Sequence, residues 1–131
     1  MGSLVLDTNA VIFLTTKGSV IPSDLEQELN QAELFISVIS EIELFCKPAL
    51  PPDEEKNLRA FLSDGILTVD ITDAVKKEAI ALRRAGRLKL PDCIVAATAI
   101  SLNAALLTAD KDLLALSWPG FQTRALSPQR S

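Results

Sequence analysis

The chain has 131 residues, 48% of them hydrophobic, and a formal net charge of −4, which excludes a disordered chain and argues against a general nucleic-acid coat protein. A chain of this length buries about two-thirds of its extended surface, so one domain (residues 1–131) can form a core without disulfides. The absence of histidine excludes Ser-His-Asp and Cys-His catalysis and histidine-rich zinc sites, which leaves carboxylates, hydroxyls, lysines and arginines as catalytic groups.

The first half of the chain alternates predicted strands and helices. In order, these are a strand at 3–6, helices at 8–15 and 23–32, a strand at 34–38, and helices at 40–46 and 53–63. Ser23-Asp-Leu-Glu26 has the pattern of a capping box, which marks the start of the second helix. Prolines between residues 48 and 52 separate the last two helices.

The second half continues this alternation. Its predicted elements are a strand at 66–71, helices at 72–85 and 91–103, a strand at 105–107, a helix at 110–116 and a weak strand at 121–126. Thr72 is the expected cap of the long helix and Gly86 its end. We expect residues 127–131 to form a frayed tail. The alternation predicts an α/β fold in which helices cover both faces of a parallel sheet of about five strands.

The sequence offers no signal for a membrane or for export. Its longest apolar runs are about five residues, against the roughly 20 that span a bilayer. The first residues show neither a signal peptide nor a myristoylation pattern. Cys46 and Cys93 lie in apolar segments, so we expect two buried free thiols. These observations predict a cytoplasmic protein without membrane association.

Acidic residues follow several predicted strands, at the edge where the carboxyl ends of the strands meet. These are Asp7 after the first strand, Glu43 in the helix after the second, Asp92 at the start of the helix at 91–103, and Asp110 and Asp112 after the fourth. Ligands of open α/β sheets bind beyond this edge. Gathered carboxylates repel one another unless a cation compensates them, and their oxygens favour Mg²⁺ or Mn²⁺. The pattern therefore predicts an acidic metal site.

Each acidic residue also has a purely structural interpretation. Asp7 and Asp110 stand where they can cap helices, and Ser40-Glu-Ile-Glu43 has a capping-box pattern. Asp92 lies in a first helical turn, where the helix dipole favours an anion. Caps explain each residue singly, but independent caps need not gather at one edge of a sheet. Their common location keeps both interpretations open.

Four motifs in order resemble those of the PIN-domain nucleases. They are Leu6-Asp7-Thr8-Asn9, Ser37-Val-Ile-Ser40-Glu-Ile-Glu43-Leu44, Leu90-Pro-Asp92-Cys-Ile-Val-Ala-Ala97-Thr98 and Leu107-Thr108-Ala-Asp110-Lys-Asp112-Leu113. Each motif alone is weak, but four motifs with this order and spacing are specific. The chain length is similar to that of the small VapC-type toxins of bacterial and archaeal toxin–antitoxin pairs.

The resemblance implies a single PIN-like domain with metal-dependent endoribonuclease activity, in which water activated by Mg²⁺ or Mn²⁺ hydrolyses RNA phosphodiester bonds. It implies a set of catalytic and metal-binding residues, namely Asp7, Glu43, Asp92 and Asp110, with Asp112 as a further candidate metal ligand. Supporting hydrogen bonds would come from Thr8, Asn9, Ser40 and Thr108. Asp7 is the best candidate to bridge two ions, because it follows what should be the central strand.

A basic segment precedes Asp92. Residues 76–89 carry a net charge of +5, while the rest of the chain sums to −9. The candidate RNA-binding residues in this segment are Arg83, Arg84, Arg87 and Lys89. A solvated helix face is an equally good interpretation of these charges. Trp118 and Phe121 can stack a base, but packing in the core is the simpler expectation.

The resemblance also implies partners. An active ribonuclease harms its own cell, so a cognate VapB-like antitoxin is implied, together with a homodimer. An antitoxin arginine can pair with the carboxylates and displace metal. Its apolar face would cover exposed side chains of residues 40–62, which contain Ile42, Leu44, Phe45, Leu58, Phe61 and Leu62. The implied homodimer would bury part of the same surface. The alternative is that these side chains all face the sheet.

Two other functions remain open. An aspartyl phosphotransfer enzyme would use Asp7 as nucleophile, but haloacid-dehalogenase-like phosphatases have a second Asp where Asn9 stands. A catalytically inactive PIN-fold binding module would keep the fold without the reaction. A nuclease assay with and without metal separates the nuclease from the binding module, and burst phosphorylation of Asp7 would indicate the phosphotransfer enzyme.

Overall fold

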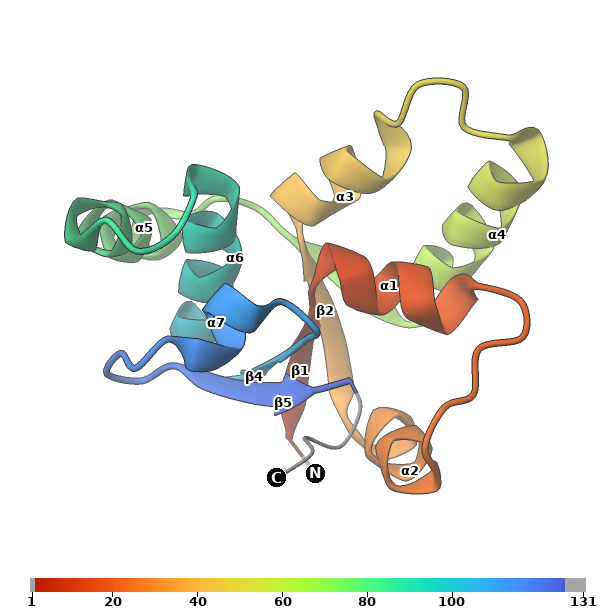
Figure 1. Cartoon of the computed structure of the whole chain (residues 1–131), viewed down its shortest axis with the longest axis horizontal. Coiled ribbons are helices and arrows are strands. Elements are labelled where there is room, and N and C mark those ends of the chain that lie inside the picture. Colours follow the sequence, from red (N-terminus) through yellow and green to blue (C-terminus); the bar gives the residue numbers. More distant parts are fainter. Residues whose placement is uncertain (1, 127–131) are drawn as a thin grey trace.

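A five-stranded parallel sheet forms the centre of the computed structural model, which describes residues 2–126 (Figure 1). The strands are β1 (Ser3–Leu6), β2 (Glu33–Ser37), β3 (Ile66–Val69), β4 (Ala105–Thr108) and β5 (Gln122–Ala125). Their order is β3-β2-β1-β4-β5, and every neighbouring pair is parallel. The predicted α/β architecture with about five parallel strands is confirmed.

Seven helices connect the strands within residues 2–126. They are α1 (Thr8–Thr15), α2 (Ser23–Gln31), α3 (Val38–Phe45), α4 (Pro52–Ser63), α5 (Asp73–Ala85), α6 (Leu90–Ser101) and α7 (Lys111–Ala115). Two predicted ends of α5 are confirmed. The Thr72 hydroxyl accepts a hydrogen bond from the Val75 N–H (3.2 Å), and Gly86 ends the helix in the left-handed region at φ 78°.

Two cores lie on opposite faces of the sheet, because alternate strand residues point to opposite sides. Val5 of β1 packs in the core beneath α5 and α6, and Leu6 packs in the core beneath α1, α2 and α4. Figure 1 shows α5 and α6 on one side of the sheet and α1, α3 and α4 on the other. The apolar helix α6 is buried as predicted, including Cys93 and Val95 through Ala99.

The helix that carries Glu43 begins earlier than predicted. α3 starts at Val38, and its N-cap is Ser37, whose hydroxyl accepts a hydrogen bond from the Ile39 N–H (3.3 Å). The capping-box interpretation of Ser40–Glu43 is therefore wrong, because Ser40 already lies inside the helix. The capping box at Ser23–Glu26 is also wrong. There the N-cap is Pro22, which has no side chain that can bond the free N–H groups.

The remaining differences are small. β3 ends at Val69 instead of residue 71, and β5 covers four residues instead of six. The prediction of two buried thiols holds for Cys93 but is wrong for Cys46, which is exposed just beyond α3. The predicted frayed tail, residues 127–131, lies outside the described residues.

Ionic contacts attach the edge strand β5 to α2. Arg124 donates to Glu28 Oε1 (2.9 Å) and to Asp24 Oδ2 (3.1 Å).

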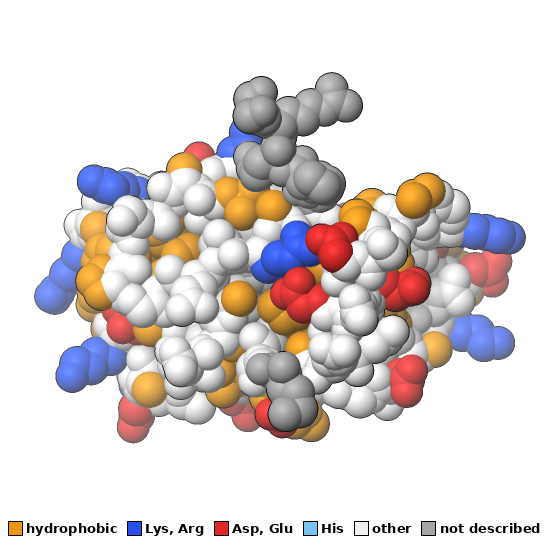
Figure 2. All heavy atoms as spheres, turned by 90° about the horizontal axis from the view of Figure 1, so that it is seen from below, with side chains coloured by type: hydrophobic (Ala, Val, Ile, Leu, Met, Phe, Trp, Pro, Cys, Tyr) orange, Lys and Arg blue, Asp and Glu red, His pale blue; other side chains and the backbone are white. Residues whose placement is uncertain are grey.

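On the face seen in Figure 2, acidic and basic side chains are interspersed, without a segregated basic surface. None of the helices between residues 2 and 126 combines the length and the apolar character that crossing a membrane requires.

Candidate active site

The candidate site lies where the strand order changes direction. β1 is the central strand, and the chain passes from it to β2 on one side and, later, to β4 on the other. Crevices of open α/β sheets form beyond the carboxyl ends of the strands at such a point. Asp7 directly follows β1, and its backbone N–H donates to the Leu107 carbonyl of β4 (3.0 Å). The first predicted site residue is therefore held at the centre of this edge.

The Asp7 carboxylate is buried and bonded through both oxygens. Only 6% of the residue is exposed. Oδ1 accepts a hydrogen bond from the Thr8 N–H (2.8 Å), so Asp7 caps α1. Oδ2 accepts from the Thr108 hydroxyl (2.7 Å) and from the Asn9 amide (3.3 Å). The carboxylate is thus both a helix cap and the junction between β1 and β4.

Thr8 and Asn9 extend this junction to the neighbouring elements. The Thr8 hydroxyl donates to Glu43 Oε1 of α3 (2.9 Å). The Asn9 side-chain oxygen accepts from the Ala109 N–H (3.1 Å). These contacts join residues 35 and 100 positions apart in the sequence. Thr8 and Asn9 thus connect Asp7 to α3 and to the segment after β4, and their supporting role in a metal site stays a prediction.

Asp110 is anchored on the other side of the site. The Thr108 hydroxyl, which donates to Asp7, accepts the Asp110 N–H (3.0 Å). Asp110 is the N-cap of α7, and its Oδ1 accepts from the Leu113 N–H (3.0 Å). The capping interpretation is therefore correct for Asp7 and Asp110, and it does not exclude a shared site, because each carboxylate still has one oxygen outside its cap.

The pKa shifts of two carboxylates show that the predicted acidic residues lie near one another. Burial raises the pKa of Asp7 above its ordinary value, and the charges of Asp110 and Glu43 raise it further. The hydrogen bonds from Thr108 and Thr8 lower the same pKa in part. A raised pKa means that this site disfavours another negative charge. It is therefore a site that a cation would stabilise.

Asp92 belongs to the same group. It lies in the first turn of α6, after Pro91. Burial raises its pKa to about 6, with contributions from the charges of Asp110, Asp7 and Glu43, while Lys89 lowers it. Asp92 thus lies within electrostatic range of the other three carboxylates, and Asp7 lies within range of Asp110 and Glu43, although the four come from different segments of the chain.

Two predicted residues stand apart from this group. Asp112 is exposed in the first turn of α7. Ser40 is fully buried on α3, and its hydroxyl has no hydrogen-bond partner among the described residues. The hydroxyl that caps α3, and so helps to orient Glu43, belongs to Ser37, to which the motifs assigned no role. Its signal was a serine one residue before the end of the predicted strand at 34–38.

The donor set fits a hard divalent cation. It consists of carboxylate oxygens, with hydroxyl and amide groups beside them, as Mg²⁺ and Mn²⁺ prefer. Within residues 2–126, no three Asp, Glu or Cys side chains already stand in a group that could hold an ion. Any ion would therefore require the side chains of the four carboxylates to turn towards it.

The pH dependence of stability should reveal the electrostatic cost of this site. Asp92 has an ordinary pKa of 3.8 and a folded-state pKa of about 6. Between these two pH values the folded protein therefore holds a proton that the unfolded chain has lost. Its contribution to stability is present below pH 3.8 and is lost as the pH rises through about 6. The free energy of unfolding, measured with urea in the presence of EDTA between these two pH values, should therefore depend less on pH in Asp92→Asn. Asp64→Asn, which changes an exposed carboxylate, is the control and should keep the stronger dependence. Parallel curves would contradict the electrostatic description of Asp92.

The comparisons with known proteins agree with this geometry. The family model described as PIN domain matches residues 4–119. No curated protein matches the chain. Among solved structures, a toxin–antitoxin complex from Klebsiella pneumoniae contains a chain with 30% identity and a TM-score of 0.70, and the match covers 91% of this chain and 95% of that one.

Two further structures share the fold at lower identity. VapBC2 from Rickettsia felis, bound to a DNA fragment from its promoter, matches with 22% identity and a TM-score of 0.75, covering 97% of this chain and 100% of that one. VapBC-1 from nontypeable Haemophilus influenzae matches with 22% identity and a TM-score of 0.69, covering 96% and 98%. With the family match extending over most of its length, the chain belongs to the PIN domain family.

Proposed function

We propose that the protein is a metal-dependent endoribonuclease and the toxin of a toxin–antitoxin pair. The observation that carries the proposal is the buried Asp7 carboxylate, which is bonded to Thr108 and lies within range of three other carboxylates. A purely structural cap does not require three further acids around it. A site for a divalent ion next to a phosphodiester gives all of them a function, as ligands of the ion.

The chain's own residues would position the ion and the substrate. Asp7, Glu43, Asp92 and Asp110 would hold Mg²⁺ or Mn²⁺, with Asp112 as a further candidate ligand. When bound, the ion would activate water and relieve charge on the phosphoryl oxygens. Thr8 orients Glu43, and Thr108 orients Asp7 and Asp110, through the hydrogen bonds described above. These contacts would limit how far the carboxylates must turn to reach the ion.

The direct test is cleavage of RNA by the purified protein, with Mg²⁺, with Mn²⁺ and with EDTA. We expect defined RNA fragments in the presence of either metal and none with EDTA. Sequencing of the fragment ends would identify the substrate, and single-stranded DNA of the same sequence is the matched control. Binding of RNA without cleavage under any condition would instead support the inactive PIN-fold binding module.

RNA would approach this acidic site along basic residues. Of the four candidates, Lys89 lies near enough to lower the pKa of Asp92. Arg87 is exposed in the same connection between α5 and α6. Arg83 donates to the Leu88 carbonyl (3.0 Å) and thereby stabilises this connection. We propose that Arg87 and Lys89 contact phosphates beside the cleavage site.

Salt dependence should identify these phosphate contacts. Replacing Arg87 and Lys89 by Ala should make the association constant for RNA less dependent on salt. The slope of its logarithm against the logarithm of the salt concentration should fall in magnitude by about 1.4, since each phosphate contact with single-stranded RNA contributes about 0.7. Binding should be measured in an Asp7→Asn background, so that RNA stays intact. Lys56→Ala together with Arg59→Ala, two exposed cationic residues of α4 outside the basic segment, is the control. An unchanged slope would assign Arg87 and Lys89 to plain solvation.

A groove beside the site could receive a VapB-like antitoxin. It lies between α1, α3 and α4, has a volume of about 460 Å³, and includes Glu43 at its wall. Ile12 is 51% exposed there. Of the apolar residues at 40–62, Ile42 is 54% exposed, whereas Leu44 and Leu58 are buried. We propose that an amphipathic antitoxin segment occupies this groove and extends an arginine to the carboxylates.

Expression tests this partner. The protein alone should arrest growth, and coexpression of the neighbouring small open reading frame should restore it. Ile12→Asp should weaken capture of that partner, measured by calorimetry with the purified proteins. Val20→Asp, at a side chain that is 83% exposed outside the groove, should leave capture intact. Harmless expression and a partner-free protein from the native cell would contradict the toxin proposal.

A further inference from the structure

Lys111 is a cation beside the acidic site that the contacts of the fold do not explain. It is the first residue of α7, directly after Asp110, and its side chain is exposed. It forms no ion pair with any residue between positions 2 and 126, although Asp110 and Asp112 flank it in the chain. A first helical turn favours anions over cations. The stability of α7 therefore gives no reason for a lysine at this position.

A groove begins at Lys111. It lies between α7 and the edge strand β5, has a volume of about 590 Å³, and is lined by Lys111, Leu114, Ala115, Thr123 and Ala125. This volume lies within the range of small-molecule sites. Lys111 is the one charged side chain among these described lining residues. The groove therefore favours a ligand that carries negative charge.

This charge distinguishes the groove from the one proposed for the antitoxin. The groove between α1, α3 and α4 has carboxylates of Glu43 and Glu54 in its wall, together with Lys17 and Lys47. A lining of mixed charge suits a peptide, which can offer both signs. A lining with a lysine and no carboxylate among the described residues suits a polyanion such as an RNA strand.

The strand order places this groove directly beside the acidic residues. Asp7 follows β1, Asp110 follows β4, and β5 is the next strand along the same edge of the sheet. Neighbouring strands are about 4.8 Å apart, so β5 lies about 10 Å from β1. A stacked nucleic-acid strand rises by about 3.4 Å per nucleotide, and about three nucleotides span this distance. A strand whose scissile phosphate lies at the carboxylates can therefore reach the groove.

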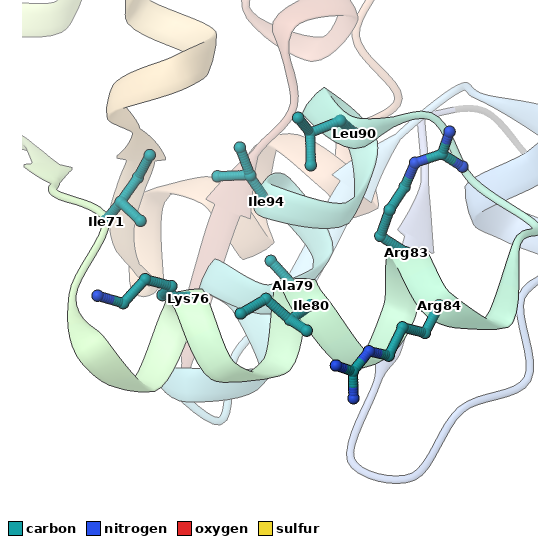
Figure 3. A pocket seen from close by; sticks show the side chains of 8 residues that line it. All are labelled: Ile71, Lys76, Ala79, Ile80, Arg83, Arg84, Leu90 and Ile94. Carbon is teal, nitrogen blue, oxygen red and sulfur yellow. The ribbon is translucent and has the colours of Figure 1, made fainter.

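The basic segment at 76–89 supplies cations on another side of the acids, at the start of α6. Lys89 lies there, near enough to lower the pKa of Asp92. Figure 3 shows the guanidinium of Arg83 on the same side of α5 as Leu90, and that of Arg84 on the opposite side. The groove between α5 and α6 has apolar walls, with Ile80 and Leu90 48% and 54% exposed, which do not suit a polyanion. Residues of the basic segment do not line the α7–β5 groove.

We propose that Lys111 binds an RNA phosphate on the opposite side of the scissile bond from Arg87 and Lys89, and that the α7–β5 groove receives the attached nucleotide. This proposal rests on the proposed nuclease function and deepens it. The substrate would be a strand that crosses the acidic edge from α6 to β5, with a phosphate on each side of the cleaved bond. Lys111 would position this strand without contacting the reacting atoms.

Salt dependence tests the contact. Association with a single-stranded RNA oligonucleotide of mixed sequence should be measured in the Asp7→Asn background with EDTA. Lys111→Ala should lower the magnitude of the salt slope by about 0.7, the contribution of one phosphate contact, and Lys111→Arg should keep the slope, because it keeps the charge. Lys56→Ala, at an exposed lysine of α4, is the control. Alanine is a strong helix former, so α7 should persist, and thermal melts would verify this.

A neutral phosphate analogue tests on which side of the bond Lys111 acts. Oligonucleotides would carry one methylphosphonate, placed on either side of the bond that the wild-type protein cleaves. On one side the analogue should weaken binding when Lys111 is present and have no further effect in Lys111→Ala. On the other side it should lose its effect only when Arg87 and Lys89 are replaced. Such a cycle isolates the coupling between one side chain and one phosphate.

Two results would overturn the inference. An unchanged salt slope in Lys111→Ala would assign Lys111 to plain solvation, and coupling of Lys111 to the same side as Arg87 and Lys89 would exclude the proposed path. RNA cleavage with an unchanged slope would remove the Lys111 contact and leave the nuclease function standing. A reduced slope without cleavage in any metal would keep the contact and support the inactive binding module.

Discussion

Replacing Asp7 by Asn should reduce RNA cleavage by orders of magnitude while the protein remains folded. The substitution keeps the size of the side chain and an oxygen that can accept the Thr8 N–H, so the start of α1 is preserved. It removes the negative charge that the proposed site uses to hold a divalent ion between four carboxylates. The measurement is the initial rate of RNA cleavage at saturating Mg²⁺, compared with wild type.

The stability of the same variant distinguishes catalysis from capping. Burial and the charges of Asp110 and Glu43 raise the pKa of Asp7, so removing its charge should leave the metal-free protein equally stable or more stable at neutral pH. A role confined to capping predicts the reverse pattern. In that case Asp7→Ala would cost about 1 kcal/mol of stability, and cleavage would be unchanged.

A control variant makes this comparison specific. Asp64→Asn removes one carboxylate charge at an exposed position just after α4, which is not among the charges that raise the pKa of Asp7 or Asp92, and should cleave RNA as the wild type does. If Asp7→Asn retained cleavage comparable to Asp64→Asn, Asp7 would not bind a catalytic ion, and the proposed mechanism would be wrong.

Removing divalent metal should have the second large effect. With EDTA, cleavage should stop, and Mg²⁺ or Mn²⁺ added in excess should restore it. An ion that binds only the folded state also stabilises it by mass action, by roughly 2.7 kcal/mol when its free concentration is 100 times its dissociation constant. The melting temperature should therefore rise with metal concentration.

The metal effect should depend on the predicted ligands. Asp7→Asn and Asp92→Asn should each diminish the rise in melting temperature, whereas Asp64→Asn should not. Because metal competes with protons for carboxylates, and the pKa of Asp92 is about 6, affinity should fall as the pH drops below this value. If calorimetry detected no Mg²⁺ or Mn²⁺ binding at millimolar concentration, the metal-site assignment would be wrong.

Local features of the site were predictable because they depend on neighbouring residues. Asp7 follows a short apolar strand, and Asp92 follows a proline at the start of an apolar helix, so both positions could be assigned from periodicity and breaker residues. The errors were also local. Ser40 and Ser23 have the spacing of capping boxes, but the strand before Ser40 and the proline before Ser23 place both serines within the helices.

The sequence alone determined the alternation of strands and helices and the edge at which the acidic residues gather, because apolar periodicity and the rules for parallel sheets are sufficient for both. Only the tertiary structure decided which groups meet there. The bond from Thr108 to Asp7 spans 101 residues, and the exposure of Ile80 depends on how α5 packs on α6. Such contacts follow from packing across the whole fold, which the pattern of neighbouring residues does not contain.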